Sequence, residues 1–421
     1  MSSQLYFDLT ELFVASSKFR YYGISRVVAE IAYELSQLDP KVQFVAFSPG
    51  HQKFFKLNPT FAPEIPPHLL VDIKIPSGVR PIRTRLAYQR APIVLQPFFW
   101  LRSLLIRALN RNRWEKFDFQ FQPIDLNDGT LISMGRPKLM AEFLVALPPK
   151  ATLRFIPLLH DVMPLSSQDK AALGTFFSNF LSDNNLVIQR ASKVLANSFS
   201  TKQELHRFER AGILKPLPAV EVVQLAHECR ESLEPVHSKP PAVRYLLCVG
   251  STLGRKNLGV VLEAFLLLQR RGTLKFSLVL AGTMRRRVRN ALASKRYEAI
   301  SSKVLSVIDP NQAELVLFYK HCTALVLPSF IEGWGLPAGE ALWFGRRVIC
   351  SDIPVLREVC GDQASFFNPQ SPQALADLIE KLDALEGAKN MVSSDKDAQV
   401  FERGKLRSWQ IVAEDLIGKV P

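Results

Sequence analysis

The second half of the chain alternates short apolar segments with helical ones, and this pattern constrains the fold more than any other feature. Strands are predicted at Tyr245–Gly250, Leu274–Ala281, Val304–Ile308, Ala324–Leu327 and Arg347–Ser351. Helices are predicted at Asn257–Arg270, Glu314–His321, Pro337–Phe344 and Pro372–Leu385. Apolar strands that alternate with helices are typical of a parallel sheet covered on both faces.

The first half shows a looser version of the same alternation. Strands are predicted at Leu5–Leu9, Val42–Phe47, Leu153–Leu159 and Val194–Ala196, and helices at Gly23–Leu35 and Thr201–Ala211. The segment Glu231–Pro241 contains three prolines and is interpreted as a linker. A length of 421 residues allows two or three domains. We therefore expect two similar Rossmann-like α/β domains, residues 1–232 and 243–400, with a cleft between them and a final segment at 401–421.

Charge and cysteine usage limit the partners and the compartment. Subtracting 39 Asp and Glu from 53 Lys and Arg gives a net charge of +14, which favours anionic partners such as phosphates, nucleic acid or an acidic membrane. The basic residues lack the interleaved aromatics of single-strand binders, so nucleic acid is not expected. The five cysteines form no CxxC pair, which indicates a reducing compartment. With no signal-peptide pattern and no apolar run near about 20 residues, the expected location is cytoplasmic.

The turn after the strand ending at Gly250 is the first candidate binding site. It runs from Ser251 to Asn257 and contains Arg255 and Lys256. A strand-to-helix turn presents free amides and the positive end of a helix dipole, and both favour an anion. Arginine can also hold phosphate oxygens in a bidentate fork. The spacing fits neither a Walker A loop nor GxGxxG, and a solvated basic turn is the alternative interpretation.

The second candidate site is the glycine-rich segment Ser329–Glu340. Gly333 and Gly335 allow the backbone to approach a ligand closely, and Pro337 suits the first turn of a helix. Glu332 is therefore expected on the loop and Glu340 on the helix, with free amides between them. This layout suits a nucleotide sugar, which has hydroxyls at both ends and phosphates in the middle. The alternative is a structural turn with two solvated glutamates.

Histidines and acidic motifs were weighed as catalytic or metal-binding groups. His160 follows an apolar strand and precedes a turn, so a functional position at the cleft is predicted for it. The seven histidines include no HExxH motif and no cluster with ligand spacing. Asp395 and Asp397 form a DxD sequence in a polar stretch, which is interpreted as a solvated loop. No metal is expected.

These residues resemble a known family. Glu332 and Glu340, with seven residues between them, match the E-x7-E motif of family 4 glycosyltransferases, also called glycosyl transferases group 1. Residues 248–257 resemble its phosphate-binding loop, and 351–359 and 366–369 resemble the stretches that follow the motif. Weaker matches are 23–27, His160-Asp161, 196–198 and Ser408-Trp409. The resemblance is dense from about residue 245 to 369 and absent from about 49 to 122.

The resemblance implies the GT-B fold, in which two Rossmann-like domains face a central cleft, with the C-terminal helix packing back on the N-terminal domain. It implies a retaining, metal-independent transfer in which Arg255 and Lys256 neutralise the leaving diphosphate. Glu332 would contact the transferred sugar, Glu340 the ribose, and His160 the donor sugar. The implied donor-binding residues are Gly23, Gly250, Ser251, Asn257, Gly333, Trp334, Gly335, Leu336 and Glu340.

Two departures and several alternatives accompany this resemblance. Tyr22-Gly23 replaces the paired glycines of many members, and Gly339 replaces a larger apolar residue. The loops at 23–27 and 332–337 look most like mannosyl- and rhamnosyltransferases of O-antigen assembly. They imply a GDP-sugar donor and a glycan or lipid-linked acceptor in lipopolysaccharide or surface polysaccharide synthesis. The alternatives are a nucleotide-sugar epimerase of the same fold, a basic binding protein and an inactive scaffold.

The segment 76–116 is predicted to be a basic amphipathic insertion. Residues 76–114 contain eight arginines and no acidic residue. On a helix from Pro97, one side is apolar and the other polar, as in an interfacial membrane helix. The predicted contacts with an anionic membrane, on the inner face of the plasma membrane, are Phe98, Leu101, Arg102, Leu105, Arg107 and Arg111. The alternative is a helix whose apolar side packs on the N-terminal domain.

Overall fold

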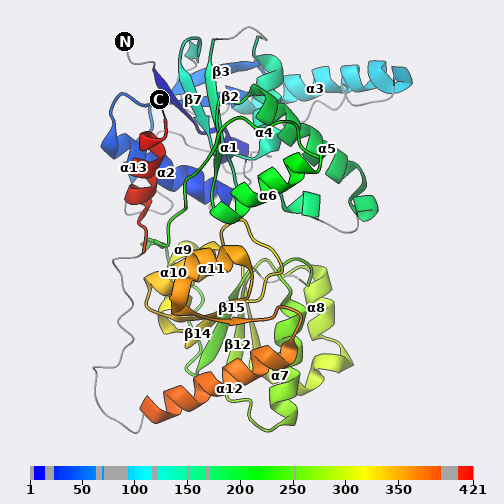
Figure 1. The fold of residues 1–421 in the computed structure, drawn as a ribbon, viewed down its shortest axis with the longest axis vertical. Helices are drawn as coiled ribbons and strands as arrows, with labels where there is room; N and C mark the ends of the chain where they lie inside the picture. Colours follow the sequence, from blue (N-terminus) through cyan, green and yellow to red (C-terminus); the bar gives the residue numbers. More distant parts are fainter. Residues whose placement is uncertain are drawn as a thin grey trace. The chain divides into compact units, whose positions relative to one another are not determined.

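A computed structural model describes residues 4–14, 23–62, 69–70, 93–115, 122–148, 152–166, 170–250, 253–389 and 406–420. The chain divides into two compact units (Figure 1). Unit 1 contains Met1–Leu225 and Trp409–Pro421, and unit 2 contains Ala226–Ser408.

Unit 1 is built on an eight-stranded sheet with strand order β10-β9-β8-β7-β1-β2-β3-β6. The strands are β1 Leu5–Asp8, β2 Gln43–Ser48, β3 Lys53–Leu57, β6 Pro123–Ile124, β7 Thr130–Ser133, β8 Arg154–Leu159, β9 Val194–Ala196 and β10 Val220–Val222. Neighbouring strands are parallel except for β3, which is antiparallel to β2 and to β6. A separate antiparallel pair is formed by β4 Phe61–Ala62 and β5 Leu69–Leu70.

Helices connect the strands of unit 1, and the last helix of the chain also belongs to this unit. They are α1 Thr10–Val14, α2 Ile24–Leu38, α3 Gln96–Trp114, α4 Pro137–Ala146, α5 Lys170–Arg190, α6 Phe199–Arg210 and α13 Trp409–Gly418, with short 3-10 turns at Ile93–Leu95 and Met163–Ser166. Helix α13 packs against α2, and Trp409 at its start is fully buried. Lys193 also donates a hydrogen bond to the carbonyl of Lys419 at 2.7 Å. The expectation that the C-terminal helix packs on the N-terminal domain is confirmed.

Unit 2 is a six-stranded parallel sheet with strand order β13-β12-β11-β14-β15-β16. The strands are β11 Tyr245–Val249, β12 Ser277–Gly282, β13 Val304–Ile308, β14 Ala324–Leu327, β15 Arg347–Ser351 and β16 Ala364–Phe367. The helices are α7 Leu258–Arg270, α8 Arg286–Leu292, α9 Gln312–His321, α10 Leu336–Trp343, α11 Pro354–Cys360 and α12 Pro372–Lys389, with 3-10 segments at Lys295–Lys303 and Gly361–Gln363. The prediction of two α/β units with mainly parallel sheets is confirmed.

The proline-rich segment after residue 230 is part of unit 2 rather than a free connection. Glu314, near the start of α9, accepts hydrogen bonds from the backbone amides of His237 and Ser238 at 2.9 and 2.6 Å. Asn311 donates to the carbonyl of Pro235 at 2.7 Å. These bonds fix the segment to α9, so the division between the units falls earlier, at Leu225.

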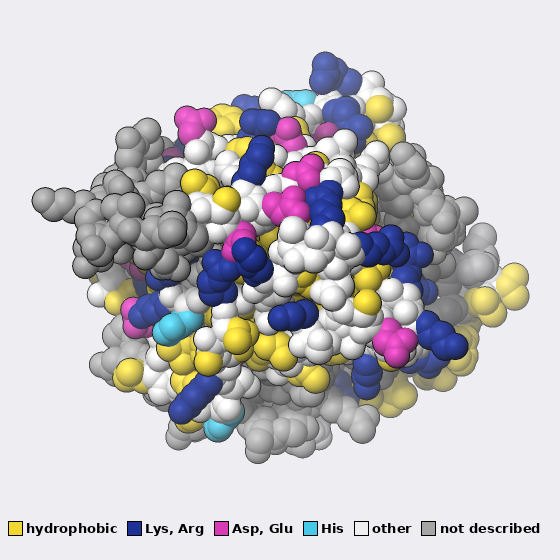
Figure 2. All heavy atoms as spheres, turned by 90° about the horizontal axis from the view of Figure 1, so that it is seen from below, with side chains coloured by type: hydrophobic (Ala, Val, Ile, Leu, Met, Phe, Trp, Pro, Cys, Tyr) yellow, Lys and Arg dark blue, Asp and Glu magenta, His cyan; other side chains and the backbone are white. Residues whose placement is uncertain are grey.

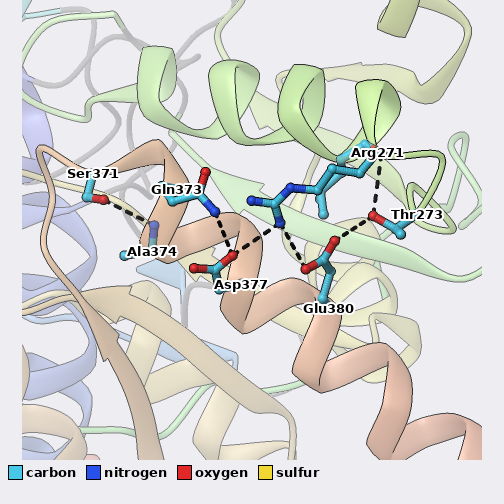
Figure 3. Close-up of polar contacts among 8 residues, drawn as sticks. Arg271, Thr273, Ser371, Gln373, Ala374, Asp377 and Glu380 are labelled. Atoms are coloured by element: carbon cyan, nitrogen blue, oxygen red, sulfur yellow. Dashed lines mark hydrogen bonds and ion pairs between the residues drawn. The ribbon is translucent and has the colours of Figure 1, made fainter.

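Charged side chains tie α7 to α12 on the outside of unit 2 (Figure 3). Arg271, at the end of α7, contacts Asp377 at 3.1 Å and Glu380 at 2.9 Å, and the Thr273 hydroxyl donates to Glu380 at 2.6 Å. Figure 2 shows Lys and Arg side chains interspersed with Asp and Glu on the face seen from below. The positive charge of the described residues is therefore not gathered into one continuous field on that face.

Replacing Trp409 by alanine tests whether α13 is an integral part of unit 1. Removing a fully buried tryptophan leaves a cavity and costs about 3–5 kcal/mol of folding free energy. Hydrogen exchange of the α2 amides should therefore accelerate in Trp409→Ala. In Ile411→Ala, which alters an exposed residue of the same helix, it should stay near the unmodified rate. Unchanged exchange in Trp409→Ala would show that α13 does not support unit 1.

Candidate active site

The two candidate loops meet at one edge of the unit 2 sheet. Strands β11 and β14 are neighbours, with Leu246 opposite Ala324. Strands β12 and β13 extend the sheet on the β11 side of this pair, and β15 and β16 extend it on the β14 side. Ligands of open α/β sheets bind outside the carboxyl ends of the strands at such a switch point. The turn after β11 and the loop after β14 are therefore in the position where this fold class binds ligands.

Glu332 joins the two loops through a buried ion-pair cluster. Its carboxylate contacts Lys256 Nζ at 2.6 Å and Arg255 Nη1 at 3.0 Å, and it accepts a hydrogen bond from the Ser329 hydroxyl at 2.6 Å. The Glu332 side chain is only 7% exposed, whereas that of Arg255 is 42% exposed. The amide of Phe330 also donates to the Arg255 carbonyl at 3.0 Å. Two cations predicted on one loop and a carboxylate predicted on another thus form one site.

The protonation of Glu332 follows from these neighbours. Burial by itself raises the pKa of this carboxyl, but the charges of Lys256 and Arg255 and the hydrogen bonds from Lys256 and Ser329 outweigh it. The pKa of Glu332 is therefore below its usual range, and the group is ionised at neutral pH. Two cations and one carboxylate leave the cluster with one net positive charge, which favours an anion.

Asn257 holds the two loops in place. Its side-chain amide donates to the carbonyls of Pro328 and Pro369, at 3.0 and 2.7 Å. Its backbone is left-handed, with φ of 48°, immediately before α7 begins. Because both amide hydrogens are used inside the protein, Asn257 is a positioning residue, with only its carbonyl oxygen left to reach a ligand. Of the other residues predicted on this turn, Gly250 has φ of 74° and Ser251 lies outside the described residues.

The start of α10 requires glycine at Gly335. This residue has φ of 101°, and a Cβ there would lie 2.7 Å from Leu356 Cδ2. The turn leaves the Leu336 amide at the N-terminus of α10, whereas Pro337 has no N–H and the Ala338 amide donates to the Gly335 carbonyl at 2.9 Å. Glu340 lies one turn further along and is buried, with its Oε2 accepting the Tyr319 hydroxyl at 2.5 Å. The two glutamates of the motif therefore occupy different environments, one among cations and one beside a phenol.

Trp334 and Gly339 share a contact that the sequence did not reveal. Trp334 is buried, donates from Nε1 to the Ala226 carbonyl at 3.3 Å, and meets the His227 ring edge to face. A Cβ on Gly339 would lie 3.2 Å from the Cα of His227. Gly339 lets the backbone of His227 lie directly against α10.

His227 is itself fixed by hydrogen bonds on both ring nitrogens. Nδ1 accepts from the Arg407 amide at 3.1 Å, so Nε2 carries the hydrogen that is donated to the Val359 carbonyl at 2.9 Å. Burial lowers the pKa of His227, which keeps the ring neutral. His227 and Tyr319 were absent from the predicted site. Both residues lie outside the E-x7-E segment, so no local sequence pattern indicated that they belong to the site.

The predicted residues of unit 1 are described separately. His160 follows β8, is buried, and donates from Nε2 to the Met134 carbonyl at 2.6 Å. Burial lowers its pKa to about 4, so the ring is neutral and only Nδ1 is left to face a ligand. Gly23 begins α2 with φ of 61° and is exposed. No group of three or more His, Cys, Asp or Glu able to hold a metal occurs within the described residues, and Asp395 and Asp397 lie outside them.

Comparisons with known proteins agree with this geometry. Residues 230–397 match the family model described as glycosyl transferases group 1. The matched residues, which make up less than half of the chain, are similar to this family. They cover almost all of unit 2, including both loops and both glutamates of the motif.

Curated relatives and solved structures extend the likeness. The mannosyltransferase WbdA of Escherichia coli is 26% identical over 231 residues, which are 53% of this chain and 28% of WbdA. The O-antigen chain mannosyltransferase RfbU of Salmonella typhimurium is 24% identical over 61% of this chain and 68% of RfbU. The chain thus spans under a third of the length of WbdA. Sucrose-phosphate synthase from Thermosynechococcus elongatus superposes with a TM-score of 0.62 at 15% identity, covering 98% of this chain and 97% of that one, which supports the GT-B fold.

The depressed pKa of His160 predicts an acid-dependent loss of stability. The unfolded histidine binds a proton below about pH 6.5, whereas the buried one does so only near pH 4. The full folding stability is thus present above pH 6.5, and protonation of the unfolded histidine reduces it as the pH falls towards 4. Between pH 7 and pH 5 the unmodified protein should lose about 2 kcal/mol more than His160→Gln. Urea unfolding of unit 1 in the unmodified protein and in His160→Gln, at pH 7 and at pH 5, measures this difference. Equal losses of unfolding free energy in the two proteins would show that His160 titrates normally.

Proposed function

We propose that this chain is a group 1 glycosyltransferase that acts as a retaining, metal-independent hexosyltransferase. It moves mannose or rhamnose from a nucleotide-diphosphate sugar, preferably a GDP-sugar, to a glycan or lipid-linked acceptor in O-antigen or other lipopolysaccharide synthesis. The observation that carries the proposal is the cluster of Glu332 with Lys256 and Arg255 at the switch point of unit 2. The two relatives named above are both mannosyltransferases, which supports the choice of sugar.

The cluster suits a substrate that carries a diphosphate beside a sugar. An incoming diphosphate competes with the Glu332 carboxylate for Lys256 and Arg255, because each cation gains more from phosphate oxygens than from a single shared carboxylate. Glu332 is then released to accept hydrogen bonds from hydroxyls of the transferred sugar. Glu340, held by Tyr319, accepts from the ribose at the other end of the motif.

The charges of Lys256 and Arg255 also account for the proposed chemistry of the transfer. The bond between the anomeric carbon and the diphosphate oxygen breaks, and negative charge develops on the leaving phosphate beside Lys256 and Arg255. The acceptor hydroxyl attacks from the same face and passes its proton to a leaving phosphate oxygen, so the configuration is retained. In this scheme neither glutamate of the motif acts as a nucleophile, since Glu332 accepts hydrogen bonds from the sugar hydroxyls and Glu340 is held beside Tyr319. No step requires a metal.

Two rival functions differ in their products or their ligands. A nucleotide-sugar epimerase with the same loops would release an epimer or free nucleoside diphosphate without any acceptor. A non-catalytic binding protein would give no product with any donor. The pairing of Arg255 and Lys256 with Glu332 supports the transferase over the binding protein, because two adjacent cations would stabilise the charge of a leaving diphosphate.

Substitutions in the cluster should separate catalysis from binding. Lys256→Ala and Arg255→Ala should each lower turnover about 100- to 1000-fold, because each removes one charge that stabilises the leaving group. Glu332→Gln should also damage transfer, but its affinity for GDP should be retained or rise, because two cations lose their internal partner. Glu340→Gln should instead weaken GDP binding.

The measurements are donor turnover with a glycan acceptor and GDP titration by calorimetry. Lys275→Ala is the matched control, because it removes a charge that pairs with Asp383 on the outside of unit 2. It should leave both quantities unchanged. Normal turnover in Lys256→Ala and Arg255→Ala would refute the phosphate assignment, and an equal loss of GDP affinity in both glutamate variants would refute the division of roles.

A further inference from the structure

Helix α3 packs on unit 1 with a face that the apolar pattern did not indicate. Among the residues of α3 whose side chains the structure describes, the buried ones are Ser103, Ile106, Asn110 and Trp114, which lie along a single stripe. The Trp114 ring lies 5.2 Å from that of Phe13 and 5.9 Å from that of Phe55. This polar and aromatic stripe, rather than the leucine-rich side, anchors α3.

A glycine allows this anchoring at close range. Gly50, in the turn between β2 and β3, lies so near α3 that a Cβ there would be 2.6 Å from the backbone nitrogen of Arg111. The backbones of the turn and the helix are therefore in direct contact. The rotation of α3 about its own axis is fixed by this contact together with Trp114.

The leucine-rich side of α3 consequently faces away from the body of unit 1. Phe98, Leu101 and Leu105 are 64%, 63% and 62% exposed, and Leu104 and Leu109 are also exposed. In Figure 1, α3 extends away from the sheet of unit 1. The alternative in which the apolar side packs on the domain is wrong for the described structure, because that side is the exposed one.

Arginines border this apolar face on both edges. At about 100° per residue, Arg102 and Arg113 fall on one edge and Arg107 and Arg111 on the other. Arg102 and Arg111 are exposed, whereas Arg107 and Arg113 are half-buried. Helix α3 contains no acidic residue. Trp100, also exposed, is an aromatic with a polar edge, a residue type enriched at membrane interfaces.

We propose that the exposed face of α3 is a docking surface for an anionic lipid bilayer. The face, defined by Phe98, Leu101, Leu104, Leu105 and Leu109, enters the boundary between headgroups and acyl chains. The bordering arginines reach lipid phosphates, as in other interfacial helices. No helix within the described parts of the chain is long and apolar enough to cross a bilayer. The proposed contact is made by the exposed face of α3, and it does not depend on the proposed transfer activity.

Charge favours a bilayer over a second copy of this chain. If two α3 faces paired about a twofold axis, the bordering arginines of both copies would be brought together with no acidic residue of α3 between them. An anionic lipid surface instead supplies the opposite charge along both edges of the face.

The test is co-sedimentation of the full chain with phosphatidylcholine vesicles that contain or lack phosphatidylglycerol. We expect binding only to the anionic vesicles, and Leu101→Asp/Leu105→Asp should abolish it. Arg102→Gln/Arg111→Gln should weaken it about 30-fold, because each arginine near an anionic surface contributes about a fivefold gain. Two matched controls carry the same chemical changes elsewhere and should bind normally: Leu233→Asp/Leu385→Asp, which alters exposed leucines, and Arg285→Gln/Arg287→Gln, which alters exposed arginines.

Circular dichroism and thermal melting are measured for every variant to check that it is folded. Because Leu101 and Leu105 are exposed, the double aspartate variant should fold and melt like the unmodified chain. Failure to bind anionic vesicles, or binding that both α3 variants leave intact, would overturn the proposal. Dimerisation that the leucine variant abolishes, without any vesicle binding, would overturn it in favour of an interface between two copies.

Discussion

The ion-pair cluster of Glu332 with Lys256 and Arg255 is the interaction on which the unit 2 site depends. It brings a carboxylate from the loop after β14 into contact with two cations from the turn after β11. Removing one partner of a buried ion pair leaves the other charges uncompensated, so the cluster is costly to break unless another anion replaces the carboxylate. Under the proposed function a diphosphate is such a replacement, so the same cluster would both hold the two loops together and bind phosphate.

The rest of unit 2 holds this cluster in position by means other than charge. The sheet order places β11 beside β14, and the Asn257 amide connects the two loops to the segment after β16. At the other end, Trp334 and Gly339 fit around His227, whose ring is fixed by Val359 and Arg407. The geometry of the turn after β11 and of the loop after β14 is therefore set by residues that lie far apart in the sequence.

The sequence predicted five of the six strands of unit 2, all except β16, and the two loops of the site, because strand length and glycine spacing are local signals. In unit 1 it missed β3, β6, β7, β10 and the pair β4–β5, because these short strands lack the long apolar runs of a buried parallel sheet. It also could not decide which side of α3 packs inward, because that depends on Gly50 and Phe55 of a different segment. The same limit applied to Asn257 and His227, whose partners are identified only by the tertiary structure.

The most direct test of the phosphate role of the cluster is a thermodynamic cycle with GDP and GMP, measured by calorimetry on the unmodified chain and on Lys256→Ala. If Lys256 contacts the terminal phosphate of the diphosphate, the unmodified chain should prefer GDP over GMP. Loss of the lysine should reduce that preference at least about tenfold, as expected for one hydrogen bond between charged groups. The same ratio of GDP to GMP affinity in both proteins would contradict the assignment of the diphosphate to this cluster.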